Sequence, residues 1–164
     1  LVEDRPGLTY VGRLDYLTEG ALLMTTDGAA AHALTHPSRG VERTYVATVR
    51  GDAISAAREA MRGVELEDGI AYPSSATAHP VPGRRHYEFE VVLTEGKHHE
   101  VRRLCAALGL EVERLVRTTF GPVRLGTLPS GASRPLNKRE SDLISSLVKQ
   151  PPNGRHGTRQ RGNQ

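Results

Sequence analysis

Residues 12–28 read GRLDYLTEGALLMTTDG and place a polar, charged segment directly before an apolar one. The apolar run at residues 21–26 ends at Asp27-Gly28, a dipeptide typical of turns, and therefore predicts a buried strand. Arg13 and Asp15 stand two positions apart, so in an extended segment their side chains would point to the same side. From residue types alone, an ordinary Arg–Asp pair on a surface loop explains this stretch at least as well as a functional site does.

Outward from this stretch, short strands are interspersed with short helices. Residues 42–50 alternate, with Tyr45, Ala47 and Val49 on one face, which predicts a strand. Further strands are expected at residues 9–11, 86–93, 111–118 and 122–125 and in short pieces between 63 and 82, and helices at 29–35, 54–61, 99–108 and 137–148. Because strands and helices do not alternate regularly, the sequence predicts an α+β fold with a mostly antiparallel mixed sheet and flanking helices, not a doubly wound one.

Composition fits one globular domain. The chain has 164 residues, 37% hydrophobic and 25% charged. Its longest uncharged apolar run, residues 21–24, is far too short to cross a bilayer, and the first residues do not resemble a signal peptide. The absence of an initiator Met suggests a fragment. A single cysteine, Cys105, excludes an internal disulfide, and we expect a cytoplasmic protein.

The net charge of +3 is concentrated at the C-terminal end. Residues 149–164 contain four of the 22 basic side chains and no acid, which leaves 18 basic against 19 acidic side chains in the rest. Nucleic-acid affinity in residues 1–148 must therefore come from local clusters. The tail is rich in Gly, Pro, Arg, Asn and Gln and is expected to be disordered. It could hold phosphates non-specifically or serve only solubility.

Two further stretches contain candidate functional residues. In Arg43-Thr44-Tyr45, the aromatic ring could stack on an unstacked base while the arginine contacts a phosphate, although Tyr on a strand more often serves sheet packing. Residues 95–104 read EGKHHEVRRL, and the apolar stripe of the predicted helix leaves Arg102 and Arg103 outside the core. Two arginines near a helix start oppose the helix dipole, so an acidic partner or a phosphate would explain them, but exposed arginines often have no task.

Metal and nucleotide chemistry find little support. His32 and His36 have i, i+4 spacing, but Pro37 and the expected helix end spoil their geometry. His98-His99-Glu100 offers three potential ligands without a known metal motif, and the sequence has no phosphate-binding Walker loop. We expect no metal and no nucleotide cofactor.

Four blocks together resemble the RsuA/RluB-type pseudouridine synthases. They are GRLDYLTEGALLMTTDG (12–28), THPSRGVERTYVATVRG (35–51), EGKHHEVRRLCAALG (95–109) and RLVRTTFGPVRLGTLPSGASRPL (114–136). Gly-Arg-Leu-Asp alone would be weak evidence, but four blocks in family order are specific. The resemblance implies the pseudouridine synthase fold over residues 1–148, without the family's N-terminal S4 domain and first strand, followed by the basic tail at 149–164.

The resemblance also implies roles for individual residues. Asp15 matches the essential aspartate, Tyr45 the tyrosine that packs against the target base, and Arg102 the basic residue that pairs with the aspartate. Arg13 matches the motif arginine, a candidate to fill the space of an extruded nucleotide. RNA contacts are expected from Arg13 and from three further basic residues, Arg43, Lys97 and Arg103. Position 43 is usually Lys in the family, and position 17, here Leu, is often acidic.

The implied function is isomerisation of a specific uridine to pseudouridine in ribosomal RNA of the large subunit. The reaction gains no electrons or groups, so it requires no cofactor. The resemblance implies a carboxylate nucleophile and a target base that is flipped out of its stack. We expect a monomer whose partner is ribosomal RNA. Two alternatives remain at this point: a non-catalytic RNA-binding or ribosome-assembly module on the same fold, and a metal-dependent RNA hydrolase that uses the histidines.

Overall fold

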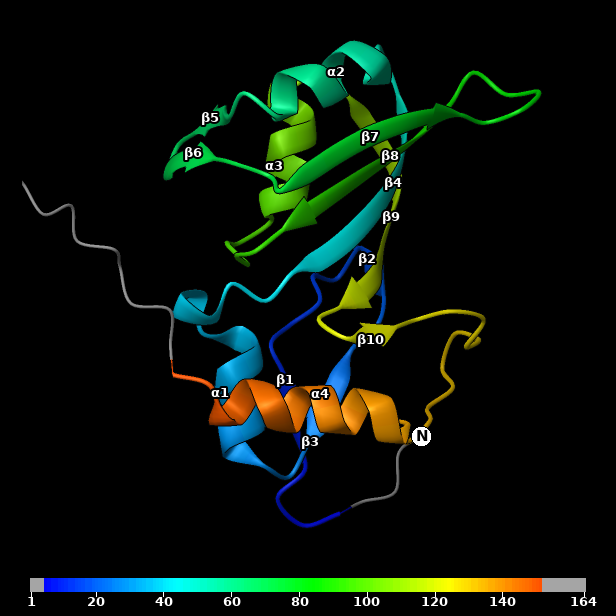
Figure 1. The fold of residues 1–164 in the computed structure, drawn as a ribbon. Helices are drawn as coiled ribbons and strands as arrows, with labels where there is room; N and C mark the ends of the chain where they lie inside the picture. Colours follow the sequence, from blue (N-terminus) through cyan, green and yellow to red (C-terminus); the bar gives the residue numbers. More distant parts are fainter. Residues whose placement is uncertain (1–4, 152–164) are drawn as a thin grey trace, which may run out of the picture.

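The computed structural model describes residues 5–151 (Figure 1). In chain order its elements are β1 (Thr9–Val11), β2 (Thr18–Gly20), β3 (Leu23–Thr25), α1 (Gly28–Thr35), the 3-10 turn η1 (Pro37–Arg39), β4 (Arg43–Arg50), α2 (Ala53–Ala60), β5 (Val64–Leu66), β6 (Gly69–Ala71), β7 (Ser75–Pro80), β8 (Tyr87–Leu93), α3 (Glu100–Ala107), β9 (Glu111–Phe120), β10 (Val123–Arg124) and α4 (Lys138–Lys149).

The main sheet is built around β4. This strand pairs antiparallel with β8 on one side and with β9 on the other, and the sheet order is β10-β9-β4-β8-β7. β2 adds to β9 in parallel, whereas every other pairing in the sheet is antiparallel. Two small antiparallel pairs, β1–β3 and β5–β6, lie outside it. The predicted α+β class with a mostly antiparallel mixed sheet is confirmed.

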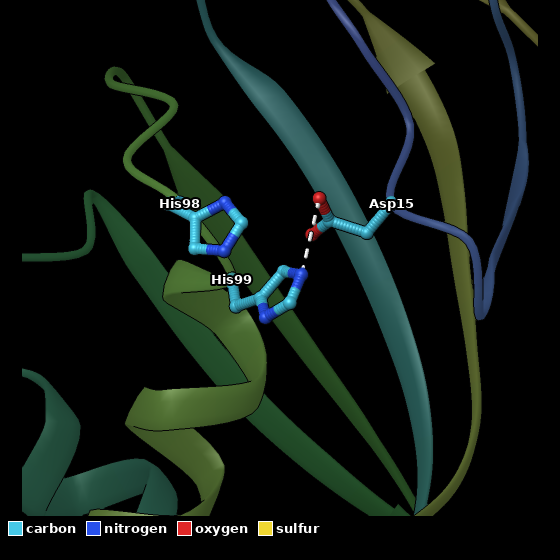
Figure 2. Close-up of side chains that lie close together, drawn as sticks. All are labelled: Asp15, His98 and His99. Carbon is cyan, nitrogen blue, oxygen red and sulfur yellow. Dashed lines mark ion pairs between the residues drawn. The ribbon is translucent and has the colours of Figure 1, made fainter.

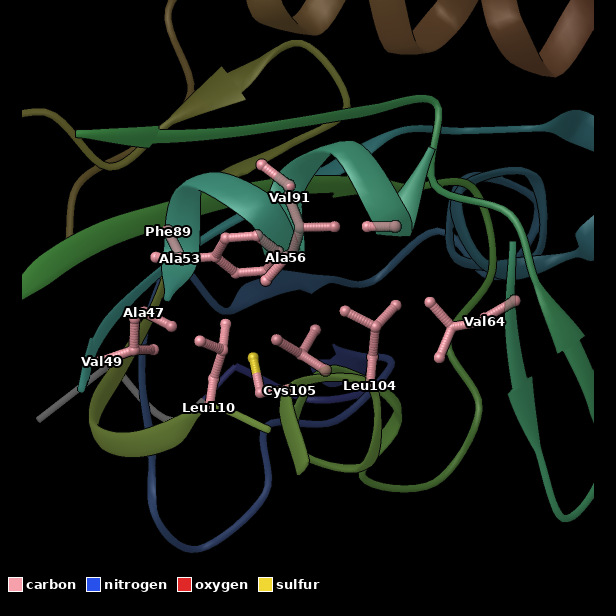
Figure 3. Packing of buried hydrophobic residues seen from close by; sticks show 14 of the residues in the cluster. Ala47, Val49, Ala53, Ala56, Val64, Phe89, Val91, Leu104, Cys105 and Leu110 are labelled. Carbon is pink, nitrogen blue, oxygen red and sulfur yellow. The ribbon is translucent and has the colours of Figure 1, made fainter. Parts of the chain in front are cut away.

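The larger hydrophobic core fills the space between the sheet and helices α2 and α3 (Figure 3). Alternate residues of β8, Phe89, Val91 and Leu93, are fully or almost fully buried, as their period-2 pattern predicts. α2 contributes only alanines to this core, which lets its backbone approach the sheet closely. α3 contributes Leu104 and Cys105, on the apolar face predicted for this helix.

A second core lies at the other end of the molecule, among β1, β3, α1, α4 and the end of β9 (Figure 1). Leu34 and Phe120 are at its centre. The last helix, α4, begins at the predicted capping box, because Asn137 Oδ1 accepts from Glu140 N at 2.8 Å and Glu140 Oε1 accepts from Asn137 N at 2.9 Å. The two cores share β9, so the long central strands connect both ends.

Two elements around residue 20 differ from the sequence prediction. Thr18–Gly20 form a strand, β2, where only a polar stretch was expected, and the next strand begins at Leu23, not at residue 21. Gly20 has φ +119°, and a Cβ at this position would lie 2.2 Å from the carbonyl oxygen of Arg117. Only glycine therefore allows β2 to lie this close to β9.

No helix within residues 5–151 is both long and apolar enough to span a membrane. The tail predicted at 149–164 starts at the last residue of α4, and its remainder from residue 152 lies outside the described residues.

Candidate active site

A pocket lies where the 13–18 loop, the middle of the sheet and the start of α3 meet. It is lined by Arg13, Leu14, Asp15, Thr18, Tyr45, Leu93, Glu95, Gly96, Lys97, His99, Glu100, Val101, Arg102 and Leu115. Of the seven site residues predicted from sequence, the pocket brings five together. Arg43 and Arg103 are not among its lining residues.

Asp15 lies on a loop whose backbone is held at both ends by Arg117. This arginine is 2% exposed, and its Nε and one terminal nitrogen donate to the carbonyl oxygen of Ala21 at 2.9 and 2.7 Å. The other terminal nitrogen donates to the carbonyl oxygen of Arg13 at 3.3 Å. Sequence analysis missed this role, although an arginine two residues after Leu115 on the same strand face was a visible signal. Arg117 thus fixes the loop that carries Asp15.

The carboxylate of Asp15 is partly exposed and lies beside His99 (Figure 2). Its Oδ1 is 3.5 Å from His99 Nε2. We expected Arg102 to pair with Asp15, but the guanidinium of Arg102 donates to the carbonyl oxygen of Leu17 at 2.8 Å, and its Nε is buried without a partner. Among the described residues it is His99, not Arg102, that lies within ion-pair distance of Asp15, so the expected Asp15–Arg102 pair is not formed in this structure.

The position of His99 depends on an unusual backbone conformation. Its φ of +49° and ψ of 32° are left-handed, and within residues 5–151 it is the only non-glycine residue with positive φ. This turn makes Glu100, not His99, the first residue of α3, one residue later than predicted. It also directs the imidazole toward Asp15 (Figure 2). Helical periodicity cannot reveal such a cap, so His99 was not assigned to the site from sequence.

Asp15, His98 and His99 lie close enough together to be considered as metal ligands. One ligand atom from each lies within 4.8 Å of the others. The two imidazole rings, however, are stacked at 3.8 Å with 22° between their planes. Nitrogen lone pairs lie in the ring planes, so those of two stacked rings run side by side and do not converge on one ion at about 2.0–2.1 Å. As placed, these residues do not fit a three-ligand metal site.

Glu100 forms a buried wall of the pocket. It is 3% exposed, its Oε2 accepts from the backbone N–H of Lys97 at 3.1 Å, and its Oε1 has no partner. Burial, assisted by the nearby carboxyl group of Glu95, raises the pKa of Glu100 to about 7. The ammonium of Lys97 lies 3.7 Å from Glu95 Oε1 and partly offsets this charge. The pocket wall therefore contains a carboxyl group that changes protonation near neutral pH.

Tyr45 occupies the boundary between pocket and core. It is half-buried and packs against the larger core, whereas Ala47 and Val49, on the same strand face, are fully buried. With Leu93 and Leu115 it gives the pocket an apolar side opposite the charged loop. Such a wall can hold the face of a planar base.

Arg43 has a different place from the one expected. It is 6% exposed, donates to the carbonyl oxygen of Leu34 at 3.2 Å and lies 4.8 Å from the ring centre of Phe120. A register shift between Thr44 and Tyr45 in the pairing with β9 sets Arg43 opposite Phe120, on the side of the second core. Burial lowers its pKa. Arg43 therefore holds the scaffold together and is not available to an RNA phosphate in this structure.

Arg103 is likewise engaged within the protein. Its two terminal nitrogens contact both carboxylate oxygens of Asp68, at 2.7 and 3.1 Å, and its Nε donates to the carbonyl oxygen of His98 at 2.9 Å. Asp68 lies in the turn between β5 and β6, so this contact ties the hairpin to α3. The expected RNA contact from Arg103 would require this paired arrangement to open.

Comparisons with known proteins show which family the chain belongs to. The family model described as RNA pseudouridylate synthase matches residues 2–107. The chain is 45% identical over 143 residues to an uncharacterized RNA pseudouridine synthase of Mycobacterium tuberculosis (strain H37Rv), covering 86% of this chain and 56% of the relative. It is 43% identical over 144 residues to ribosomal large subunit pseudouridine synthase B of Escherichia coli K12, covering 87% and 49%.

A solved structure described as a pseudouridylate synthase aligns with a TM-score of 0.75 and 31% identity, over 86% of this chain and 62% of that one. The chain spans about half the length of the curated relatives it matches.

Proposed function

Because the chain belongs to the RNA pseudouridylate synthase family, we propose that it isomerises a specific uridine of large-subunit ribosomal RNA to pseudouridine, with Asp15 as the nucleophile. The observation that carries the proposal is the convergence of Asp15, Tyr45 and Arg102 on one pocket. These three come from a loop, a strand and a helix far apart in sequence. The name of the Escherichia coli relative supports the large subunit as the source of the substrate.

The residues of the pocket fit the steps of such a reaction. The bond from ribose to the base nitrogen breaks, the base turns, and a bond to carbon replaces it, with no change in redox state. A carboxylate such as Asp15 can form a covalent intermediate with the sugar or with the base. Its bond to the substrate breaks again once the new carbon–carbon bond has formed, and the base loses a proton from that carbon and gains one on the freed nitrogen. The partial exposure of Asp15 leaves it accessible to a nucleotide that has left its stack.

Two features of the pocket would hold the flipped nucleotide. Tyr45, with Leu93 and Leu115, offers an apolar face for the uracil ring. Arg13 and Lys97 line the same pocket and place positive charge where the RNA backbone would pass. Arg102 lines the same pocket, and exchanging its bond to Leu17 for one to Asp15 would complete the pair that the family resemblance implies.

The chain's own activity provides the test. Large-subunit ribosomal RNA that lacks pseudouridine is incubated with the purified chain, and modified positions are mapped by carbodiimide labelling and primer extension. The wild type is expected to produce a new stop at one uridine, and Asp15→Asn is expected to produce none while keeping its circular dichroism spectrum. Asp142→Asn is the matched control, because this carboxylate is exposed on α4 and pairs with Lys138.

Since the chain spans half of its relatives' length, the assay is run with naked RNA and with the assembled large subunit. Full activity in Asp15→Asn would exclude this residue as the nucleophile. No pseudouridine in either substrate with the wild type would contradict the proposed activity.

A further inference from the structure

Two large hydrophobic side chains are exposed directly after the candidate nucleophile in the sequence. Tyr16 is 99% exposed and Leu17 is 66% exposed, and Tyr16 has the greatest exposure of the large hydrophobic side chains in residues 5–151. In the sequence they lie between Asp15 and Thr18. Asp15 and Thr18 line the pocket, but Tyr16 and Leu17 do not. A scattered exposed leucine needs no explanation, but an adjacent exposed aromatic at the edge of a binding pocket indicates a contact surface.

The exposure of this pair does not result from a loosely attached loop. Residues 15–18 form a turn in which Thr18 N donates to the carbonyl oxygen of Asp15 at 2.8 Å. Arg102 donates to the carbonyl oxygen of Leu17 at 2.8 Å. Immediately afterwards β2 pairs with β9, with Thr18 opposite Leu115. These three contacts fix the backbone of the turn. Binding therefore has to order only the side chains of Tyr16 and Leu17, at a small entropic cost.

We propose that the Tyr16-Leu17 turn is an RNA-base stacking site, in which the ring of Tyr16 stacks on the base next to the target uridine and Leu17 fills part of the space that the uridine leaves. This proposal rests on the proposed function. Flipping a nucleotide removes the stacking partner of its neighbour, and proteins that open a stack insert apolar or aromatic side chains at the gap. A gap next to the extruded uridine must lie close to Asp15, which is where this turn lies.

The proposal also changes the role expected of Arg13. The family resemblance made Arg13 the candidate to fill the vacated space. Arg13 lines the pocket two residues before Asp15, and its carbonyl oxygen is bound to Arg117. With Tyr16 and Leu17 at the gap, the charged side chain of Arg13 is left for a phosphate of the same nucleotide.

The composition of the chain provides a direct probe. The sequence contains no tryptophan, so Tyr16→Trp introduces a single indole at the turn. In an Asp15→Asn background, which prevents turnover, this variant is titrated with ribosomal RNA while indole emission and RNA binding are followed together. Stacking predicts quenching that saturates at the same RNA concentration as binding, and protection from acrylamide. Tyr72→Trp is the matched control, because Tyr72 is 65% exposed but lies beyond β6, outside the pocket lining.

Activity gives a second, independent measurement. Tyr16→Ala is expected to lower kcat/KM by roughly 5- to 150-fold, the effect of losing one stacked base, while Tyr16→Phe, which keeps the stacking ring, is expected to lose much less. Tyr72→Ala is expected to leave kcat/KM unchanged. Because the side chains of Tyr16 and Tyr72 are both exposed, the thermal unfolding of Tyr16→Ala, Tyr16→Phe and Tyr72→Ala should match that of the wild type.

The outcomes separate this proposal from the proposed function. If the wild type forms no pseudouridine, the proposed function fails, and the fluorescence titration still decides whether Tyr16 contacts RNA. Unchanged emission of Tyr16→Trp at saturating RNA, or wild-type kcat/KM in Tyr16→Ala, would overturn the stacking site. The same Tyr16→Trp variant is also titrated with ribosomal protein alone. Emission that changes with the protein but not with RNA would identify a protein-contact surface and would also overturn the stacking site.

Discussion

Replacing Glu100 with glutamine removes a buried titratable group from the pocket wall while keeping the side-chain length. The amide oxygen can still accept from the backbone N–H of Lys97, as Glu100 Oε2 does at 3.1 Å. The added N–H₂ group can donate to Glu95, where the ionised wild-type pair is repulsive. The substitution therefore isolates the free energy of ionising Glu100 from that of its packing.

The magnitude and sign follow from the pKa of Glu100, which burial raises from 4.5 to about 7. Between these pH values the native state binds more protons than the unfolded state, so the free energy of unfolding of the wild type falls as pH rises. At 1.36 kcal/mol for each tenfold change in proton affinity, the loss is complete above pH 7 and amounts to about 3 kcal/mol. Glu100→Gln lacks this loss.

Urea unfolding followed by circular dichroism, in steps from pH 4.5 to pH 8.5, measures the difference. The stability of Glu100→Gln relative to wild type is expected to increase by about 3 kcal/mol across this range, with most of the change between pH 5 and pH 7. A relative stability that stays constant or falls with pH would refute the assignment of a raised pKa to a buried Glu100.

Two further substitutions test other buried contacts. Arg117→Lys keeps the charge but replaces the three guanidinium nitrogens that donate to Ala21 and Arg13 by a single ammonium nitrogen, which cannot reproduce the same set of bonds. We expect the free energy of unfolding to fall by about 2–4 kcal/mol and kcat to fall with it, measured by urea unfolding and by the pseudouridine assay; unchanged stability would contradict the anchoring role. For Glu140, hydrogen bonds from Arg134 lower the pKa to about 2, so its stabilisation is present above pH 4.5 and is lost as pH falls through 2. Because Arg134 is 36% exposed and solvent screens the pair, Glu140→Gln is expected to lower the free energy of unfolding at pH 7 by only about 1 kcal/mol, and by nothing below pH 2, in the same urea experiment.

Local patterns predicted the elements that bury one face against a core. The alternation of β8 and the i, i+3, i+4 spacing of α3 each placed the correct side chains inside, because burial repeats with the period of the element. The capping box at Asn137 was predicted because its partners lie three residues apart. β2 was not predictable, because its three residues have no periodicity of their own. They form a strand only by pairing with residues 115–117 of β9, nearly a hundred residues later in the chain.

The same distinction applies to the candidate site. Residue type and family position predicted five side chains that line one pocket, and their chemical roles stay predictions until the assays are done. The contacts of Arg43 and Arg103 were not predictable, because their acceptors, the carbonyl oxygen of Leu34 on α1 and the carboxylate of Asp68 in the β5–β6 turn, reach them only through the folding of other elements. A basic residue in a family motif is thus available to RNA only if its side chain is not already hydrogen-bonded to an acceptor within the protein.

The anchoring of the loop links fold to function most directly. A nucleophile must meet its target within a fraction of an ångström, and a surface loop does not supply that precision unless neighbouring elements hold it. Arg117 on β9 and Arg102 on α3 each bind loop carbonyl oxygens, and Gly20 lets the chain lie directly against β9 after the loop. Since β9 also pairs with β4, the strand of Tyr45, the proposed nucleophile Asp15 and the proposed wall for the base are both held against one strand pair.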